Sequence, residues 1–180
     1  MTSSSQQRRE ADARILVLVP GGRNAEVTQS VLAQVGLDSE ICSGVEDLLA
    51  RLTEGAAAVL LGEEALSPRS IQALEEALRS QASWSEVPLV LLVARGSANV
   101  SRLRALKRLQ SGGNLTVLER PVLPITLQSV TLASLRARQR QYETRDLLDR
   151  LHQTTKELEA ERGRREQFVS VLAHDLRGPL

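Results

Sequence analysis

The segment AHDLRGPL places a histidine next to an aspartate, two side chains that can exchange a proton. Around this pair, apolar residues recur at intervals of three and four, at Phe168, Val171, Leu172 and Leu176. The spacing predicts one apolar stripe on a helix, with His174 beside the stripe and Asp175 about 100° further round. Pro179 lacks the N–H that an interior helix position donates, so we expect the helix to bend or end there.

His174 and Asp175 have the chemistry of a nucleophile and its base. An imidazole has an ordinary pKa near 6.5, so the ring is largely neutral at cytoplasmic pH and one nitrogen is free to attack. A carboxylate at the next position can hold the other N–H, fix the tautomer and take up charge during a transfer. The alternative is a histidine on the helix surface beside an aspartate that plays no part.

Three other features could carry chemistry, and each has a simpler interpretation. Cys42, the single cysteine, rules out an intrachain disulfide and is interpreted as a small core residue. His152 lies among polar residues and is expected to face solvent. The stretch PGGRNAE joins a predicted strand to a helix N-terminus, where a phosphate can bind. It lacks the three spaced glycines of a dinucleotide site and the Gly-Lys-Ser/Thr ending of a Walker motif, which favours an ordinary turn.

The composition bounds the class of protein. The 180 residues allow one domain plus an extension, or two small domains, and a 2 % aromatic content requires a core of Leu, Val, Ala and Ile. With 23 Lys and Arg against 22 Asp and Glu, the net charge of +1 predicts a protein partner and neither nucleic acid nor membrane. There is no signal-peptide pattern and no run of about 18 apolar residues. We therefore expect a cytoplasmic protein with a disordered segment at residues 1–12.

Short apolar runs alternate with helical patterns over residues 13–124. The runs that predict strands are RILVLVP, SEICS, AAAVLLG, VPLVLLVA and LTVLE. The patterns that predict helices are AEVTQSVLAQVG, GVEDLLARLTEG, SPRSIQALEEALRSQ and NVSRLRALKRLQ. Continuous apolar strands separated by helices indicate an α/β fold with a five-stranded parallel, doubly wound sheet.

From about Ile125 to Gly178 the sequence predicts one helix of roughly 55 residues, about 80 Å long. Its apolar residues follow an alternating four-three spacing, at Leu147, Leu151, Thr154, Leu158, Phe168 and Leu172. This is the seam of a two-stranded coiled coil, so we expect a homodimer through the long helix. Glu161 and Arg165 interrupt the seam, and Gly163 weakens the helix by about 1 kcal/mol relative to Ala. A single solvated helix with Glu–Arg pairs is the alternative.

The alternating units resemble the receiver domain of two-component response regulators, with RILVLVP, AAAVLLG, PLVLLVA and VLERP at the strand ends. The resemblance covers roughly residues 13–135. It implies a receiver/flavodoxin-like fold, yet the chemical groups of a receiver are replaced. The acidic pair after the first strand corresponds to Val19 and Pro20, and the phosphoacceptor aspartate corresponds to Gly62. Val93 replaces the hydroxyl residue, and Arg120, before Pro121, replaces the lysine.

These replacements remove the metal cage and the acceptor. Without clustered carboxylates there is no hard-oxygen site for Mg²⁺, and without an aspartate no carboxylate can be acylated by phosphate. We therefore expect no metal and no cofactor in this domain, which would sense or dock. Glu63 and Glu64 lie near the acceptor position, and we interpret them as solvated loop charges, with substitution for the aspartate as the alternative.

The segment AHDLRGPL resembles the H-box of sensor histidine kinases, which begins the dimerisation and phosphotransfer helix. The resemblance implies that His174 is the phosphoacceptor, Asp175 its general base and Arg177 a supporting basic residue. It also implies that Pro179 and Leu180 form the helix-bending pair. Gly178 stands where related kinases often have the Thr or Asn that positions water, which puts phosphatase activity in doubt.

The two resemblances together predict the order of the parts. A receiver-like domain at 13–124 precedes a signalling helix at 125–166 and the start of a dimerisation and phosphoacceptor domain at 167–180. ATP and Mg²⁺ would be bound by a catalytic domain outside this sequence, and the phosphoryl group would pass to a response regulator. We thus expect the regulatory and phosphoacceptor part of a larger cytoplasmic histidine kinase, inactive alone. The alternatives are a dimeric, non-enzymatic adaptor with an inert H-box, and a phosphorylatable response regulator with a helical output.

Overall fold

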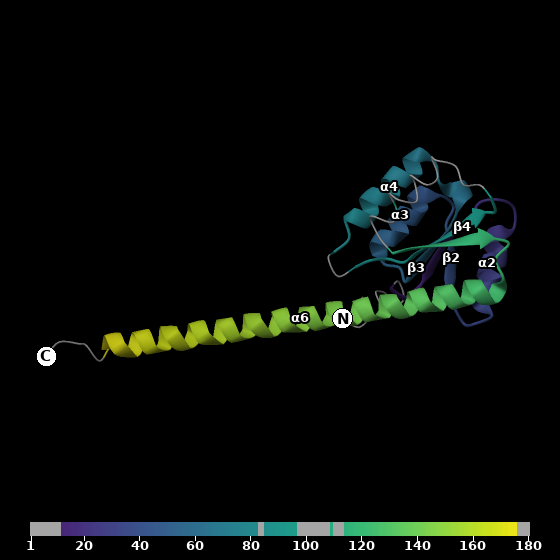
Figure 1. Cartoon of the computed structure of the whole chain (residues 1–180). Coiled ribbons are helices and arrows are strands. Elements are labelled where there is room, and N and C mark those ends of the chain that lie inside the picture. The colour runs from purple at the N-terminus through teal and green to yellow at the C-terminus, as the bar shows by residue number, and fades with distance from the viewer. Residues whose placement is uncertain (1–11, 83–84, 97–108, 110–113, 176–180) are drawn as a thin grey trace. The chain divides into compact units, whose positions relative to one another are not determined.

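The structure of the protein is a computed structural model that describes residues 12–82, 85–96, 109 and 114–175, with side chains up to residue 169 (Figure 1). The predicted helix NVSRLRALKRLQ falls outside these residues except for Leu109, and so does the expected disordered segment except for Asp12. The described chain divides into two compact units, up to Gln141 and from Tyr142.

Five strands of the first unit form one sheet in which every neighbouring pair is parallel. The strands are β1 (Ile15–Leu18), β2 (Ser39–Ile41), β3 (Ala58–Gly62), β4 (Leu89–Ala94) and β5 (Leu115–Arg120). Their order is β2-β1-β3-β4-β5, and the register aligns Val17 with Leu60 and Leu60 with Val90. This confirms the predicted α/β fold with a parallel sheet, because the apolar runs are the strands that helices cover on both faces.

The helices lie on both faces of the sheet, as a doubly wound fold requires. They are α2 (Asn24–Ala33), α3 (Val45–Glu54), α4 (Pro68–Arg79) and α6 (Pro124–Asp175), and a 3₁₀ turn η1 (Glu63–Ala65) follows β3. On one face, Leu48 of α3 and Leu74 of α4 pack into a core with alternate strand residues. On the other face, Leu32 of α2 and Leu127 of α6 pack into a second core.

Local signals explain where these helices begin and end. The hydroxyl oxygen of Ser67 accepts a hydrogen bond from the N–H of Ser70 at 3.1 Å, and Pro68 occupies the first turn of α4. Gly36, just after α2, has a φ of +72°, a left-handed conformation that favours glycine at a helix end.

The part of α6 up to Gln141 belongs to the first unit and is held there by polar contacts. The side-chain amide of Gln128 donates to the carbonyl oxygen of Val31 on α2 at 2.9 Å. Arg138, 4 % exposed, donates to the carbonyl oxygen of Ala56 at 3.2 Å and to Oγ of Ser85 at 2.8 Å. These bonds fix the end of the packed segment to the loops at the amino edge of the sheet.

The second unit consists of the remainder of α6 within the described residues. The continuous helix confirms the prediction of one long C-terminal helix. Among the described residues, no helix combines the length and the hydropathy that crossing a bilayer requires.

Candidate functional site at the carboxyl edge of the sheet

The carboxyl ends of parallel strands meet at one edge, where α/β proteins place their sites. In this protein Val19 follows β1, Gly62 ends β3 and Arg120 ends β5. Gly62 is closely covered, because a Cβ built on it would lie 2.7 Å from Oε2 of Glu64 and 3.3 Å from Cα of Val19. A carboxylate oxygen therefore occupies the space into which any side chain at position 62 would project.

Glu64 is held over Gly62 by Arg120. Nη2 of Arg120 donates to both carboxylate oxygens of Glu64 at 2.7 Å and to the carbonyl oxygen of Leu92 at 3.2 Å. The side chains of Arg120 and Glu64 are 26 % and 43 % exposed, so the pair is only partly shielded from water. Burial alone would raise the pKa of Glu64, but hydrogen bonds from Arg120 and from its own backbone outweigh burial and hold that pKa below its ordinary value.

The neighbouring Glu63 also has a partner, since its Oε1 accepts a hydrogen bond from the backbone N–H of Ala94 at 2.5 Å. Our interpretation of Glu63 and Glu64 as solvated loop charges is therefore incomplete, because both carboxylates have partners although Glu64 is exposed to solvent. Both carboxylates lie in the 3₁₀ turn η1, which directs them back to the ends of β4 and β5. Among the residues that the structure describes, no three His, Cys, Asp or Glu side chains gather closely enough to hold a metal ion.

A cavity of about 550 Å³ opens beside the Glu64–Arg120 pair, between α2 and the first residues of α6. Its lining is mostly apolar, with a few polar and charged groups. The lining residues are Val19, Asn24, Val27, Thr28, Val31, Glu64, Leu92, Ala94, Arg95, Arg120, Pro121, Val122, Pro124 and Leu127. This volume and this mixture are typical of sites for small molecules.

The stretch PGGRNAE forms the turn between β1 and α2 at the same edge. Gly21 and Gly22 have φ values of +107° and +60°, which allow the tight connection. Arg23 stands at the N-cap of α2, and its side chain does not cap the helix. The geometry is that of a βα turn, as we favoured.

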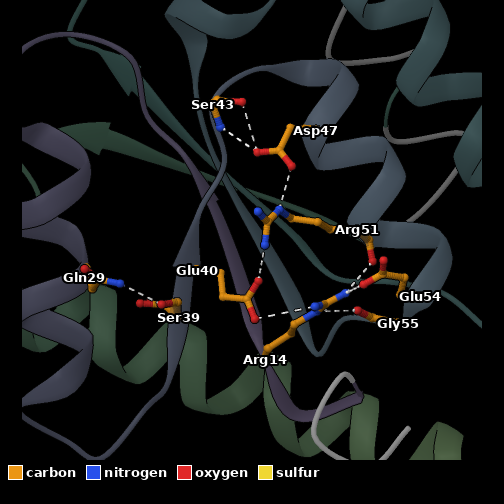
Figure 2. Close-up of polar contacts among 9 residues, drawn as sticks. All are labelled: Arg14, Gln29, Ser39, Glu40, Ser43, Asp47, Arg51, Glu54 and Gly55. Atoms are coloured by element: carbon orange, nitrogen blue, oxygen red, sulfur yellow. Dashed lines mark hydrogen bonds and ion pairs between the residues drawn. The ribbon is translucent and has the colours of Figure 1, made fainter. Parts of the chain in front are cut away.

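A second polar cluster lies away from this edge and ties α3 to the edge strand β2 (Figure 2). Arg51 pairs with Glu40 and, at 2.7 Å, with Asp47. Arg14 donates to the carbonyl oxygen of Gly55 at 3.1 Å and pairs with Glu40 at 3.5 Å. The charged groups pair with one another, so the cluster stabilises the fold; the buried hydroxyl of the nearby Ser39 has no partner among the described residues.

Cys42 is buried in the first core, which confirms our interpretation of it as a core residue. Burial, followed by the negative charge of Asp47, raises the pKa of its thiol to about 11. Such a thiol stays protonated at neutral pH and is a poor nucleophile.

The predicted phosphoacceptor pair belongs to the second unit. His174 and Asp175 lie at the end of α6, but their side chains are outside the described residues, and Arg177 is outside them altogether. Those three roles stay predictions. His152 is exposed, as expected.

Exposed apolar residues recur along α6 at the spacing predicted for a coiled-coil seam. Leu147, Leu151, Leu158 and Phe168 are each between 61 % and 64 % exposed. Leu172 belongs to the residues whose side chains are not described.

Solved structures with a similar arrangement include receiver domains of response regulators. A receiver domain (CheY-like) from Methanospirillum hungatei JF-1 matches with a TM-score of 0.57 at 18 % identity over 71 % of this chain and 97 % of its own. The fold is that of a response-regulator receiver domain. NtrX from Brucella abortus in complex with ADP matches with a TM-score of 0.58 at 20 % identity over 75 % of this chain.

This chain covers 29 % of the length of NtrX, so the likeness concerns one part of that protein. A protein described as adenylate cyclase from Rhodopirellula baltica shares the fold at 12 % identity, with a TM-score of 0.57 and coverage of 77 % of this chain and 98 % of its own. At these identities the likeness shows the receiver fold alone. No protein-family model and no curated protein matches the sequence.

Sequence reasoning missed the Glu64–Arg120 pair, the cavity beside it and the burial of Arg138. A signal for the first existed, because Arg120 occupies the lysine position of a receiver and an acidic residue follows Gly62 by two places. For the cavity and for Arg138 the sequence pattern carried no comparable signal.

Proposed function

We propose that this protein is the regulatory and phosphoacceptor part of a two-component histidine kinase. In this proposal the receiver-like domain senses or docks, and α6 connects it to His174, which accepts a phosphoryl group from ATP. The observation that carries the proposal is the unbroken helix from Pro124 to Asp175, which packs against the sheet at its start and bears the H-box-like pair at its end.

The receiver-like domain acts without phosphorylation in this proposal. Gly62 offers no carboxylate, and the side chains of Val19 and Pro20 offer no oxygen ligand for Mg²⁺. The internal pair of Glu64 and Arg120 already occupies the edge at which a receiver is modified. If this edge of the sheet regulates the kinase, it does so by binding another molecule and not by being phosphorylated.

Dimerisation through α6 is part of the same proposal. Leu147, Leu151, Leu158 and Phe168 are exposed at seam spacing, and each would contribute roughly 1.5–3 kcal/mol on full burial. A parallel dimer places two copies of His174 side by side, where one catalytic domain can serve either helix. We expect a response regulator to receive the phosphoryl group.

The chemistry at His174 needs little from the protein beyond position and charge. A neutral imidazole nitrogen attacks the γ-phosphorus of ATP, the bond from that phosphorus to the bridging oxygen breaks, and ADP leaves. Asp175 holds the other ring N–H and stabilises the positive charge that forms on the ring. The ATP-binding domain is supplied by another part of a longer chain or by a second protein.

The test measures ³²P incorporation from ATP when this chain, extended through the second helix of the proposed hairpin, is mixed with a histidine-kinase catalytic domain. His174→Gln should abolish labelling, because an amide nitrogen is not nucleophilic. Asp175→Asn should slow labelling by roughly 10²–10⁴-fold, the loss typical of a general base. His152→Gln is the matched control, because this exposed histidine lies on the same helix, and should leave labelling unchanged.

A label that survives His174→Gln would contradict the proposal. The alternative would then be a dimeric adaptor that uses the receiver-like domain for docking and has an inert H-box. The exposed seam on α6 favours dimerisation in either case.

A further inference from the structure

The cavity beside the Glu64–Arg120 pair has the features of a built binding site. Its apolar lining includes Val19, Leu92 and Leu127, which are almost fully buried, and it lies outside the carboxyl ends of β1, β3, β4 and β5. In open α/β sheets this is where ligands bind. The position follows from the topology, because the chain leaves β1 and β5 for α2 and α6 on one face of the sheet and leaves β3 for α4 on the other.

Thr28 adds an unused polar group to this lining. It projects from α2 into the cavity wall and is 7 % exposed. Other threonines on helices here, such as Thr131, donate to the carbonyl oxygen four residues earlier. Within the described part of the chain the Thr28 hydroxyl has no such partner. The Thr28 hydroxyl is therefore available to hydrogen-bond a molecule in the cavity, as donor or as acceptor.

The charged groups of the lining favour an anion. Arg95 and Arg120 contribute two guanidinium groups, and Glu64 is the single carboxylate among the lining residues. Arg120 uses one nitrogen, Nη2, for both oxygens of Glu64, whereas its buried Nε has no partner among the described residues. The pair is thus end-on, and the planar fork that binds a carboxylate through two parallel bonds is not engaged.

We propose that this cavity binds a small amphipathic carboxylate, whose acid group replaces Glu64 on Arg120 and whose apolar body lies along Val31 and Leu127. Thr28 hydrogen-bonds the ligand near its acid end. Glu64, already 43 % exposed, turns to solvent when it is displaced. The site gives the receiver-like domain a chemical input, and it stands independently of whether His174 accepts phosphate.

The experiment uses the full 180-residue chain with ¹³C-labelled Val and Leu methyl groups, titrated with octanoate in an NMR measurement. We expect saturable shifts at Val31 and Leu127. Octan-1-ol has the same apolar body without the charge, and it should bind at least about tenfold more weakly, because a hydrogen bond to a charged group is lost.

Three variants locate the site. Arg120→Gln should weaken octanoate binding about tenfold and leave octan-1-ol unchanged. Glu64→Ala should tighten octanoate binding several-fold, because the internal competitor is removed, and a gain of affinity cannot come from misfolding. Val27→Trp, at a position 58 % exposed on the rim, should weaken both probes by filling the cavity. Arg79→Gln, on α4 and outside the cavity lining, is the control for loss of a guanidinium; it removes the ion pair with Glu75 and should leave the affinities for both probes unchanged.

Several results would overturn the proposal. Equal affinities for octanoate and octan-1-ol would remove the role of Arg120, and so would unchanged octanoate binding in both Arg120→Gln and Glu64→Ala. Shifts that do not saturate, or that centre on the seam leucines of α6, would show non-specific binding to the exposed apolar surface. The titration contains no ATP and does not involve His174, so its failure and the failure of the kinase proposal are separate outcomes.

Discussion

Arg138 holds the packed part of α6 to the loops of the first unit. Removing its guanidinium tests how much these contacts contribute to the free energy of unfolding. We consider Arg138→Met, which keeps the length and the apolar stem of the side chain but none of its donors. The bonds lost outside α6 are those to the carbonyl oxygen of Ala56 at 3.2 Å and to Oγ of Ser85 at 2.8 Å.

The expected magnitude follows from these contacts. Hydrogen bonds from a charged group contribute about 1.5–3 kcal/mol each, and part of this is offset because the variant no longer buries a charge. We therefore expect a loss of about 2–4 kcal/mol in the free energy of unfolding. At about 3–4 °C per kcal/mol for a unit of this size, the melting temperature should fall by roughly 6–16 °C.

The assay is thermal and urea unfolding of the full chain, followed by circular dichroism. Arg136→Met is the matched control, since it makes the same change at an exposed position on the same helix, and it should cost less than about 0.5 kcal/mol. Ser85→Ala combined with Arg138→Met should show a coupling of about 0.5–3 kcal/mol. A melting temperature for Arg138→Met within 1–2 °C of the control would refute the assignment of Arg138 as an anchor.

Three further predictions concern the sheet edge and the helix. Gly62→Asp should give no stoichiometric adduct with acetyl phosphate and Mg²⁺, because Val19 and Pro20 supply no carboxylate for the metal and the carboxylate of Glu64, paired with Arg120, fills the space. A labelled aspartate would contradict this. Glu64→Gln should lower the free energy of unfolding by roughly 0.2–1 kcal/mol above about pH 5. Urea unfolding at a series of pH values should show this difference vanishing as the pH falls through the lowered pKa of Glu64, because the native carboxylate is then protonated. An equal loss at pH 3 and pH 7 would disprove the ion pair. Leu151→Asp with Leu158→Asp should convert a dimer to a monomer in sedimentation equilibrium, and an unchanged mass would count against the seam.

The fold could be predicted because burial in a parallel sheet leaves a plain mark on the sequence. Strands covered on both faces must be apolar throughout, and β3 and β4 follow this rule closely. The three-residue strand β2 lies within the predicted run SEICS. The long helix could be predicted because no proline interrupts the sequence between Pro124 and Pro179.

The candidate site was harder to predict because its contacts are distant in the chain. Glu63 bonds to Ala94, 31 residues away in the sequence, and Glu64 bonds to Arg120, 56 residues away. Loop residues have no periodic pattern from which such partners could be predicted. The cavity is formed jointly by α2, by the ends of β4 and β5 and by the start of α6. Its existence depends on how these elements pack, which residue types alone do not determine.

The polar face of α6 illustrates a second limit. Thr131, Ser134 and Arg138 are buried where the helix packs against the sheet, at positions that a helical pattern would normally fill with apolar residues. Because two hydroxyl groups donate within the helix and Arg138 reaches loop acceptors, the polar atoms are satisfied. The hydropathy pattern therefore did not indicate that the first compact unit extends to Gln141.

The pairing of Arg120 with Glu64 also has a consequence for timing. An acyl phosphate hydrolyses, so a phosphorylated aspartate gives a receiver a state that lasts for a limited period after the event that created it. The carboxylate of Glu64 is part of the polypeptide and holds Arg120 through no bond that water can break. The pair opens only to a proton, to salt or to a competing anion. The state of this edge is therefore set by the present concentrations of protons, salt and competing anions, and it does not persist after those concentrations change.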